Sequence, residues 1–281
     1  MNMLIADSGA TKCDWCLLTN GRKKSIYTQG ISPYFLNQEQ IQVLLAKELG
    51  PALKNIQLDE IHYYGTGLGN PENVSIIKKA LKKTFPRVII EAKDDMLGAA
   101  RALCGSKGGI AANLGTGSFA CHFNGRRILQ TRPGLGYILG DEGSGAYLGK
   151  KVLQYYLYNI FDEELRYSFE AKYLTNKIDI LDNVYKKPLP NRYLASFAIF
   201  LAGNRGHYMI ENIIEDGLND FFFMHLSKFP EINKLPVHFV GTVAYGFRDT
   251  IRELCRIYHF ELGKILQKPM DGLIAFHQGK K

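Results

Sequence analysis

The stretch Gly108 to Phe123, GGIAANLGTGSFACHF, contains the features that decide the fold. Ile110 to Leu114 is a short apolar run typical of a buried strand, and Phe119 to Phe123 resumes an extended, aromatic-rich pattern directly after Gly115-Thr116-Gly117-Ser118. The pattern predicts two strands joined by a tight glycine turn. Glycines let a backbone approach a ligand closely, and the hydroxyls in this turn add donors, so the turn suits a phosphate oxygen. A plain structural turn is the alternative.

A second element of the same kind lies near the N-terminus and favours the phosphate interpretation. Met3 to Ala6 is an apolar run, a small polar turn follows, and Cys13 to Leu18 resumes an extended pattern. Donors in such a turn can bind nucleotide phosphates while the carboxylate of Asp7 holds Mg²⁺ through water, or Asp7 can simply cap the turn. The turn is no Walker loop, because the chain has no Gly-Lys-Ser/Thr with the required spacing.

Composition and charge exclude several classes of protein. The chain has 281 residues, of which 46% are hydrophobic and 22% charged, which suits one large or two ordinary globular domains. The net charge of +8 is spread along the chain, with one lysine cluster at 78–83 on a helix, so we expect a solvated basic face and no nucleic-acid partner. Five cysteines without a paired spacing indicate reduced thiols. No apolar stretch suits a membrane span or a leader, so we expect a cytoplasmic protein without a membrane partner.

Alternating strands and helices are predicted for the first hundred residues. A meander of three strands is extended by strands near 61–64 and 88–91, which the crossover helices near 37–53 and 71–85 connect. Asp94-Asp95 directly precedes an amphipathic helix, so one carboxylate can cap that helix. A carboxylate beside a phosphate site could also accept the proton of an attacking hydroxyl.

Helices dominate the prediction beyond residue 145. The periodicity predicts helices at 146–158, 163–174, 177–184 and 192–201, a long helix at 205–229 and a last strand from Tyr258 to Leu262. The run Phe221 to Met224 is apolar over too wide an arc for a surface helix. We expect it in the core, with a homodimer contact as the alternative.

Five motifs in order carry a resemblance to a known family. They are MNMLIADSGATKCDWCLL, KDDMLGAAR, GGIAANLGTGSFACHF, GLGYILGDEGSGAYLGKK and PVHFVGTVAYGF. In this order the chain resembles the BadF-type ATPase and N-acetylglucosamine kinase family of the sugar kinase, heat-shock protein and actin superfamily. The resemblance implies an α/β, two-lobed actin-like ATPase (ribonuclease H-like) fold, with a mixed sheet and flanking helices in each lobe and an interdomain cleft. The lobes would be 1–105 with a C-terminal helix at about 269–281, and 106–268.

The resemblance also implies roles for particular residues. Asp95 would be the catalytic base, since its spacing to Gly98 matches the family motif better than that of Asp94. The phosphates of ATP would be bound by Asp7, Ser8, Gly9, Ala10, Thr11, Lys12, Gly115, Thr116, Gly117 and Ser118, with Asp7 also holding Mg²⁺ through water. The adenosine would be bound by Gly241, Thr242 and Ala244. The sugar would be bound by Ser32, Thr116, Asp141 and Glu142; the segment that carries Asp141 can alternatively cap the helix that follows.

The activity implied by the resemblance is ATP-dependent and Mg²⁺-dependent phosphorylation of an amino sugar, most simply N-acetylglucosamine at its 6-hydroxyl. Three departures from the family pattern leave the sugar open. Thr242 stands where a second glycine is common, Ser32 replaces an asparagine, and Phe119 follows the second turn where animal N-acetylglucosamine kinases carry asparagine.

Two other functions remain as alternatives. An activator ATPase of a radical dehydratase would hold an iron–sulfur cluster with cysteines at a dimer axis. Cys104 and Cys121 flank the second turn, but no cysteine lies between Cys121 and Cys255, which disfavours cluster binding. A non-catalytic sensor of sugar or ATP is the other alternative.

Overall fold

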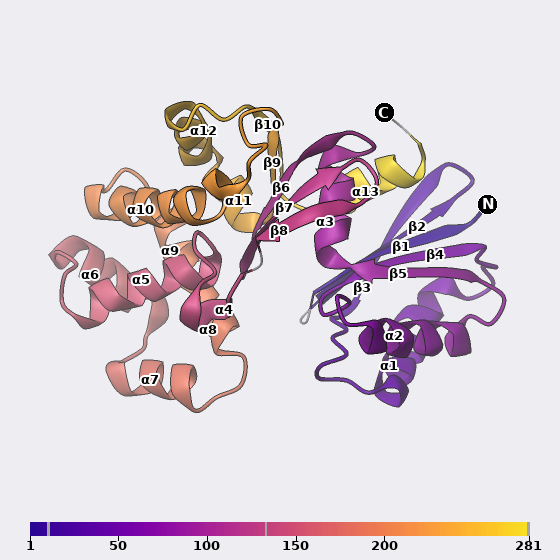
Figure 1. The fold of residues 1–281 in the computed structure, drawn as a ribbon. Helices are drawn as coiled ribbons and strands as arrows, with labels where there is room; N and C mark the ends of the chain where they lie inside the picture. Colours follow the sequence, from indigo (N-terminus) through magenta and orange to yellow (C-terminus); the bar gives the residue numbers. More distant parts are fainter. Residues whose placement is uncertain (10–11, 133, 280–281) are drawn as a thin grey trace. The chain divides into compact units, whose positions relative to one another are not determined.

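The computed structural model describes residues 1–9, 12–132 and 134–279. The chain divides into two compact units (Figure 1). Unit 1 comprises Met1–Ser106 together with Pro269–Lys281, and unit 2 comprises Lys107–Lys268. Each unit is built on its own five-stranded sheet.

The sheet of unit 1 is mixed. Its strands are β1 (Met3–Ser8), β2 (Lys12–Thr19), β3 (Arg22–Gln29), β4 (Glu60–Gly65) and β5 (Ile89–Asp94). The order is β3-β2-β1-β4-β5, in which β1 to β3 pair antiparallel and β4 and β5 run parallel to β1. Asn20 and Gly21 both have positive φ (48° and 74°), as a tight hairpin between β2 and β3 requires. The predicted meander with parallel additions is confirmed.

Helices cover both faces of this sheet. They are α1 (Gln38–Leu44), which continues as the π-helix η1 (Leu45–Leu49) and the 3₁₀-helix η2 (Gly50–Leu53), then α2 (Pro71–Thr84), α3 (Asp95–Cys104) and α13 (Met270–His277). Along β1, Leu4 and Ala6 pack in one apolar cluster, whereas Met3 and Ile5 pack in another that includes α13. The strand is therefore buried on both faces, as expected of a strand next to parallel neighbours.

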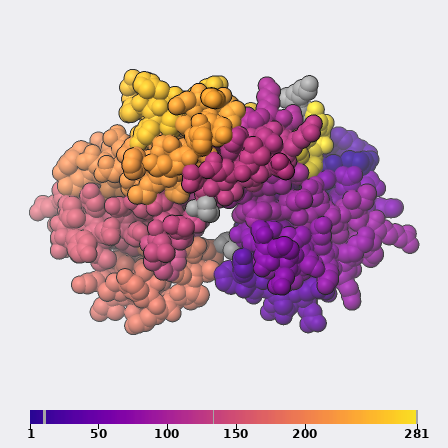
Figure 2. Space-filling model, in the orientation of Figure 1, coloured from indigo at the N-terminus to yellow at the C-terminus, as the bar shows by residue number. Residues whose placement is uncertain are grey.

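The sheet of unit 2 repeats this topology. Its strands are β6 (Gly108–Leu114), β7 (Ser118–Asn124), β8 (Ile128–Arg132), β9 (Val237–Val240) and β10 (Leu262–Leu266). The order is β10-β9-β6-β7-β8, with β6 to β8 antiparallel and β9 and β10 parallel to β6. In Figure 2 the orange surface of the later part of unit 2 lies beside the magenta surface of its earlier part, as this strand order requires.

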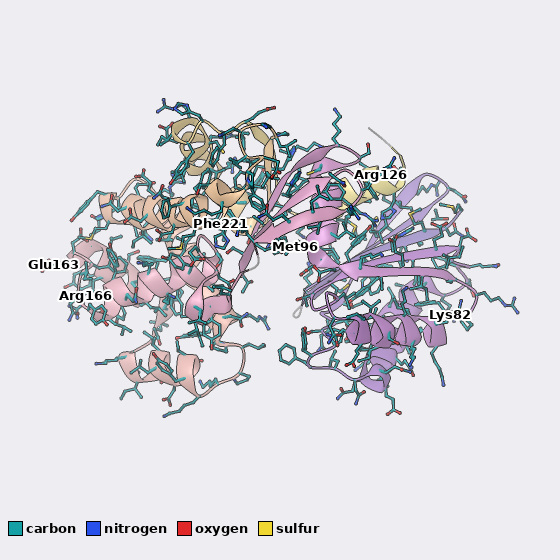
Figure 3. The ribbon with its side chains drawn as sticks, viewed as in Figure 1. Lys82, Met96, Arg126, Glu163, Arg166 and Phe221 are labelled. Carbon is teal, nitrogen blue, oxygen red and sulfur yellow. The ribbon has the colours of Figure 1, made fainter. Side chains whose placement is uncertain are left out.

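Most of unit 2 outside the sheet is helical. The elements are α4 (Gly136–Leu139), α5 (Gly145–Leu157), α6 (Glu163–Tyr173), α7 (Lys177–Tyr185), α8 (Pro190–Ser196), α9 (Ala198–Gly203), α10 (Tyr208–Met224), the 3₁₀-helix η3 (Leu226–Lys228), α11 (Thr242–Gly246) and α12 (Arg248–Ile257). Phe221 and Phe222 are fully buried in the core, whereas Phe223 and Met224 are 56% and 51% exposed. In Figure 3, Phe221 lies among these helices, and Glu163 and Arg166 lie at their outer edge. Core burial therefore holds for the first half of the apolar run.

Three predicted elements differ in the structure. The helix predicted at 192–201 is two helices, α8 and α9, that meet at Phe197. The helix predicted at 205–229 begins only after His207, whose side chain accepts from the Met209 amide. The strand predicted from Tyr258 to Leu262 is wrong: the Tyr258 amide closes α12, His259 adopts a positive φ of 56°, and the strand starts at Leu262. The aromatic residues before Leu262 suggested an extended pattern, but they pack with Phe222 in the core.

Within the residues that the structure describes, none of the helices combines the length and apolar character needed to cross a bilayer.

Candidate active site

An acidic edge lies at the carboxyl ends of the strands in unit 1. Ser8 of β1 pairs with Gly65 of β4, and Gly65 pairs with Asp94 of β5, so these strand ends are level. Asp94 caps α3 by accepting from the Met96 amide at 3.0 Å. Burial, followed by the negative charges of Asp94 and Asp7, raises the pKa of Asp95 well above its usual range. Asp7, Asp94 and Asp95 thus form one electrostatically coupled group, in which Asp95 is suited to take up a proton.

The first predicted phosphate turn lies beside this edge. The Ser8 hydroxyl is buried and accepts from the Ile31 amide at 3.2 Å, so it anchors the segment that leads to Ser32, which is also buried. The Gly9 amide donates to the Lys12 carbonyl at 3.0 Å. Lys12 directs its ammonium to Asp14, 2.8 Å away, and to the ring of Tyr27.

Ala10 and Thr11, which the sequence assigned to phosphate binding, lie outside the described residues.

The second predicted turn connects β6 to β7 in unit 2 and is tied to the start of α5. The Gly115 amide donates to the Gly117 carbonyl at 3.0 Å. The carbonyls of Gly115 and Thr116 accept from the amides of Gly145 and Ala146 at 2.8 and 3.1 Å. The turn is therefore held rigidly by the helix, and the side chain of Thr116 remains exposed. Pre-set backbone donors of this kind suit an anion.

Asp141 contacts the second turn from the other side. Its backbone has a positive φ of 58°, and its carboxylate accepts from the amides of Ser118 and Gly136. Burial raises the pKa of this carboxyl. A Cβ added to Gly134 would lie 2.2 Å from Asp141 Oδ1, so only glycine fits at position 134. The nearby Ser118 is buried, and its Oγ makes no hydrogen bond within the described residues.

The remainder of this segment has structural partners. Glu142 lies 2.8 Å from Nε2 of His225, and both side chains are largely buried. Ser144 caps α5 by accepting from the Tyr147 amide at 3.2 Å. The segment therefore does cap the helix, through Ser144, while Asp141 remains at the turn.

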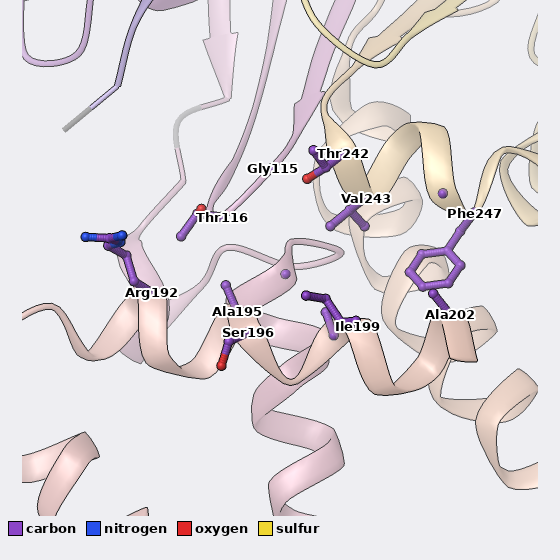
Figure 4. A pocket seen from close by; sticks show the side chains of 13 residues that line it. Gly115, Thr116, Arg192, Ala195, Ser196, Ile199, Ala202, Thr242, Val243 and Phe247 are labelled. Atoms are coloured by element: carbon purple, nitrogen blue, oxygen red, sulfur yellow. The ribbon is translucent and has the colours of Figure 1, made fainter. Parts of the chain in front are cut away.

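A cavity of about 370 Å³ lies wholly within unit 2 (Figure 4). The β6–β7 turn, the start of α5, the helices α8 and α9, and α11 surround it. The residues that line it are Gly115, Thr116, Gly145, Arg192, Ala195, Ser196, Ala198, Ile199, Ala202, Thr242, Val243, Gly246 and Phe247. The second predicted turn and the predicted adenosine loop thus border one cavity.

The adenosine loop itself depends on Gly241. This residue has a φ of 124°, and an added Cβ would lie 2.2 Å from the Leu114 carbonyl oxygen, so only glycine fits. Thr242 lines the cavity, whereas Ala244, also predicted to contact adenosine, is fully buried in the core.

The sequence did not predict that α8 and α9 form one wall of this cavity. Its small residues recur at helical spacing, at Ala195, Ala198 and Ala202, which brings the backbone close to the cavity. This spacing could have indicated a tightly packed or ligand-facing helix, but it could not have identified the turn that it faces. Arg205, which precedes α10, pairs with Glu211 and Asp249.

Cys13, Cys16, Cys104, Cys121 and Cys255 are all buried, which disfavours their shared ligation of a cluster at a subunit surface. In the described chain, no group of three or more His, Cys, Asp or Glu side chains is placed to hold a metal directly.

Comparison with solved structures identifies the class. MreB 5 of Spiroplasma citri bound to AMPPNP superposes with a TM-score of 0.58 at 10% identity, over 99% of this chain and 94% of that chain. A "putative N-acetylglucosamine kinase" from Chromobacterium violaceum superposes with a TM-score of 0.72 at 18% identity, over 98% of both chains. The two units therefore have the actin-like ATPase fold that sugar kinases share.

A further structure identifies the family. A "putative N-acetylglucosamine kinase" from Porphyromonas gingivalis is 38% identical over 99% of both chains, with a TM-score of 0.94. The chain belongs to the BadF-type ATPase and N-acetylglucosamine kinase family of the sugar kinase, heat-shock protein and actin superfamily. Searches with models of protein families and among curated proteins gave no match.

Proposed function

We propose that this protein transfers the γ-phosphoryl group of ATP to an amino sugar, N-acetylglucosamine at its 6-hydroxyl, in the presence of Mg²⁺. The observation that carries the proposal is the cavity in unit 2. It joins a glycine turn suited to phosphate to an apolar wall suited to a base, as a nucleotide requires. Relatives described as N-acetylglucosamine kinases, and a relative bound to AMPPNP, support the same assignment.

In this proposal the nucleotide lies along that cavity. The amides of Thr116 and Gly117 and the hydroxyl of Thr116 hold its phosphates, and the loop of Gly241 and Thr242 holds its adenosine. The turn from Asp7 to Lys12 in unit 1 holds the terminal phosphates.

The acidic edge of unit 1 fits a hard cation. Carboxylate oxygens are the ligands that Mg²⁺ prefers, and it usually keeps several waters, so Asp7 would hold it through water. The charge that accumulates at Asp7, Asp94 and Asp95 is the kind that a cation relieves. When bound, Mg²⁺ neutralises charge on the phosphates.

Asp95 acts as the general base in this proposal. Its carboxylate accepts the proton of the sugar hydroxyl as that oxygen attacks phosphorus. The proposed sugar contacts are Ser32 from unit 1, and Thr116, Asp141 and Glu142 from unit 2. Asp141 has oxygen lone pairs beyond those used by Ser118 and Gly136, so it can accept from ring hydroxyls.

A panel of sugars tests the proposal. The purified chain is supplied with ATP and Mg²⁺, and ADP release is followed with N-acetylglucosamine, glucosamine, N-acetylmuramate or glucose. We expect fast release with one amino sugar, and a phosphate on its 6-oxygen by nuclear magnetic resonance. ATP binding without sugar-dependent turnover would instead indicate a sensor. A brown, iron-containing protein would indicate the dehydratase activator.

A further inference from the structure

The cavity in unit 2 has one charged side chain among the thirteen described residues that line it, and this is Arg192 on α8. In the view of Figure 4, Arg192 and Thr116 lie toward one end of the cavity, and Ala202 and Phe247 lie toward the other. The cavity is therefore polar and cationic at the turn and apolar at the far end.

The turn by itself offers few donors to a phosphate. The Gly115 amide is occupied by the Gly117 carbonyl, and the Ser118 amide by the Asp141 carboxylate. The carboxylate of Asp141 also lies close to Gly117, since a Cβ there would be 3.0 Å from Asp141 Oδ2. An anion at this end of the cavity would thus meet neutral donors and a nearby negative charge, and it needs a cation.

Arg192 meets this need. It is exposed at the rim, and among the described residues no hydrogen bond or ion pair engages its guanidinium. A planar guanidinium matches phosphate oxygens with two parallel hydrogen bonds, and charge-assisted bonds of this type are about twice as strong as neutral ones. Because Arg192 borders the cavity itself, it meets the part of the ligand that the cavity holds, which is the nucleoside and its first phosphates.

We propose that Arg192 binds the diphosphate that ATP and ADP share and thereby sets the affinity for nucleotide. The inference rests on the proposed function, since it assumes that the cavity holds a nucleotide. A contact to the phosphates that are not transferred is equally strong before and during reaction. It therefore lowers KM for ATP and leaves kcat unchanged.

The test compares Arg192→Gln with Arg166→Gln. Arg166 is an exposed arginine of the same unit, on α6 and outside the cavity, so its replacement is matched in charge. ADP and adenosine are titrated into the full-length proteins by calorimetry at fixed salt. We expect the Kd for ADP to rise about 10-fold to 100-fold in Arg192→Gln, as for loss of a charged hydrogen bond. The Kd for adenosine should not change, and Arg166→Gln should behave as wild type.

Each other outcome overturns a specific statement. If wild type binds ADP and Arg192→Gln binds it equally well, the assignment of Arg192 fails and the proposed function stands. If wild type binds neither ATP nor ADP, the proposed function fails, and the role of Arg192 with it. If adenosine binding is lost together with ADP binding, the variant has damaged the cavity. In that case Arg192→Lys, which keeps the charge, must bind ADP more tightly than Arg192→Gln does. If it does not, the assignment of Arg192 is rejected.

Discussion

The two units have the same strand order but carry opposite chemistry at corresponding positions. At the strand ends of unit 1 lie three carboxylates, those of Asp7, Asp94 and Asp95. At the corresponding turns of unit 2 lie glycines and hydroxyls, and the cavity beside them has an arginine. One sheet design thus presents carboxylates in one unit and glycines, hydroxyls and an arginine in the other.

The difference arises outside the sheets. Between the third and fourth strands, unit 1 has only α1, η1 and η2, whereas unit 2 has seven helices and η3 over Gly136 to Lys228, counted over the described residues. This insertion supplies α5, which fixes the second turn, and α8 and α9, which wall the cavity. The repeated sheet positions the turns, and the added helices form the walls of a cavity at one of them.

The largest effect on activity is expected at the acidic strand ends of unit 1. Asp95→Asn removes the proposed base while nearly keeping the shape, so kcat should fall about 10²-fold to 10⁴-fold without loss of folding. Sugar-dependent ADP release measures it, and circular dichroism checks the fold. Near-wild-type turnover would remove Asp95 from its role.

Asp94→Asn is the matched control. Asparagine caps helices as well as aspartate does, so α3 should stay intact and activity should persist. Since the charge of Asp94 contributes to the raised pKa of Asp95, the variant should also shift the acid limb of the pH–rate profile to lower pH. An unshifted limb would show that another group controls it.

A smaller effect is expected on the glycine side. Gly241→Ala places a Cβ against the Leu114 carbonyl in a backbone region that costs about 1–3 kcal/mol for other residues. We expect unit 2 to lose at least about 3 kcal/mol of stability, because the backbone clash adds to this strain. Thermal unfolding and hydrogen exchange of β6 and β9 measure it. Gly246→Ala is the control, since no atom lies within 4 Å of its added Cβ; equal losses in both variants would contradict the argument.

The smallest expected effect is a change in the stability of unit 2 with pH. Burial lowers the pKa of His238 on β9 to about 4, whereas the unfolded chain titrates near 6.5. As pH falls, the unfolded chain binds the proton first, so this contribution is complete above about pH 6.5 and is lost progressively toward pH 4, by about 2 kcal/mol.

An asparagine at this position tests the origin of that loss. His238 Nδ1 accepts from the Lys264 amide at 2.9 Å, and the side-chain oxygen of His238→Asn can accept in its place without taking up a proton. Stability of unit 2 between pH 6.5 and 4 should then vary less than in wild type. Hydrogen exchange in β9 and β10 reports it; identical pH dependence in both proteins would assign the loss to other groups.

Local patterns predicted much of the fold. Both hairpins, the parallel strands and the Asp94 cap follow from short-range rules. The spacing of apolar residues, the glycines in turns and the cap residues each determine structure only within a few positions of the chain, so the sequence shows them directly. The break at Phe197 and the late start of β10 were missed, since tertiary packing outweighs local propensity at both places. Phe197 packs on Phe169 and Tyr173, and Tyr258 and Phe260 pack on Phe222.

The site was less predictable because it joins distant segments. The turn at Gly115 and the loop at Thr242 were each recognisable, but Arg192 and Phe247 become cavity residues only when the tertiary fold brings them to that turn. Conversely, the Ser8 hydroxyl looked available in the sequence, but it is buried against Ile31. Sequence shows which groups exist, whereas burial decides which of them a ligand can reach.

The C-terminal helix has a consequence for synthesis of the chain. Helix α13 packs on α3 so closely that a Cβ on Gly272 would lie 2.3 Å from the Ala102 carbonyl oxygen, and α3 begins with Asp95. On the ribosome, the first 106 residues emerge early, but the helix that covers α3 leaves the exit tunnel only after all of unit 2. The unit whose first strands are made first is therefore completed only after unit 2 has been made.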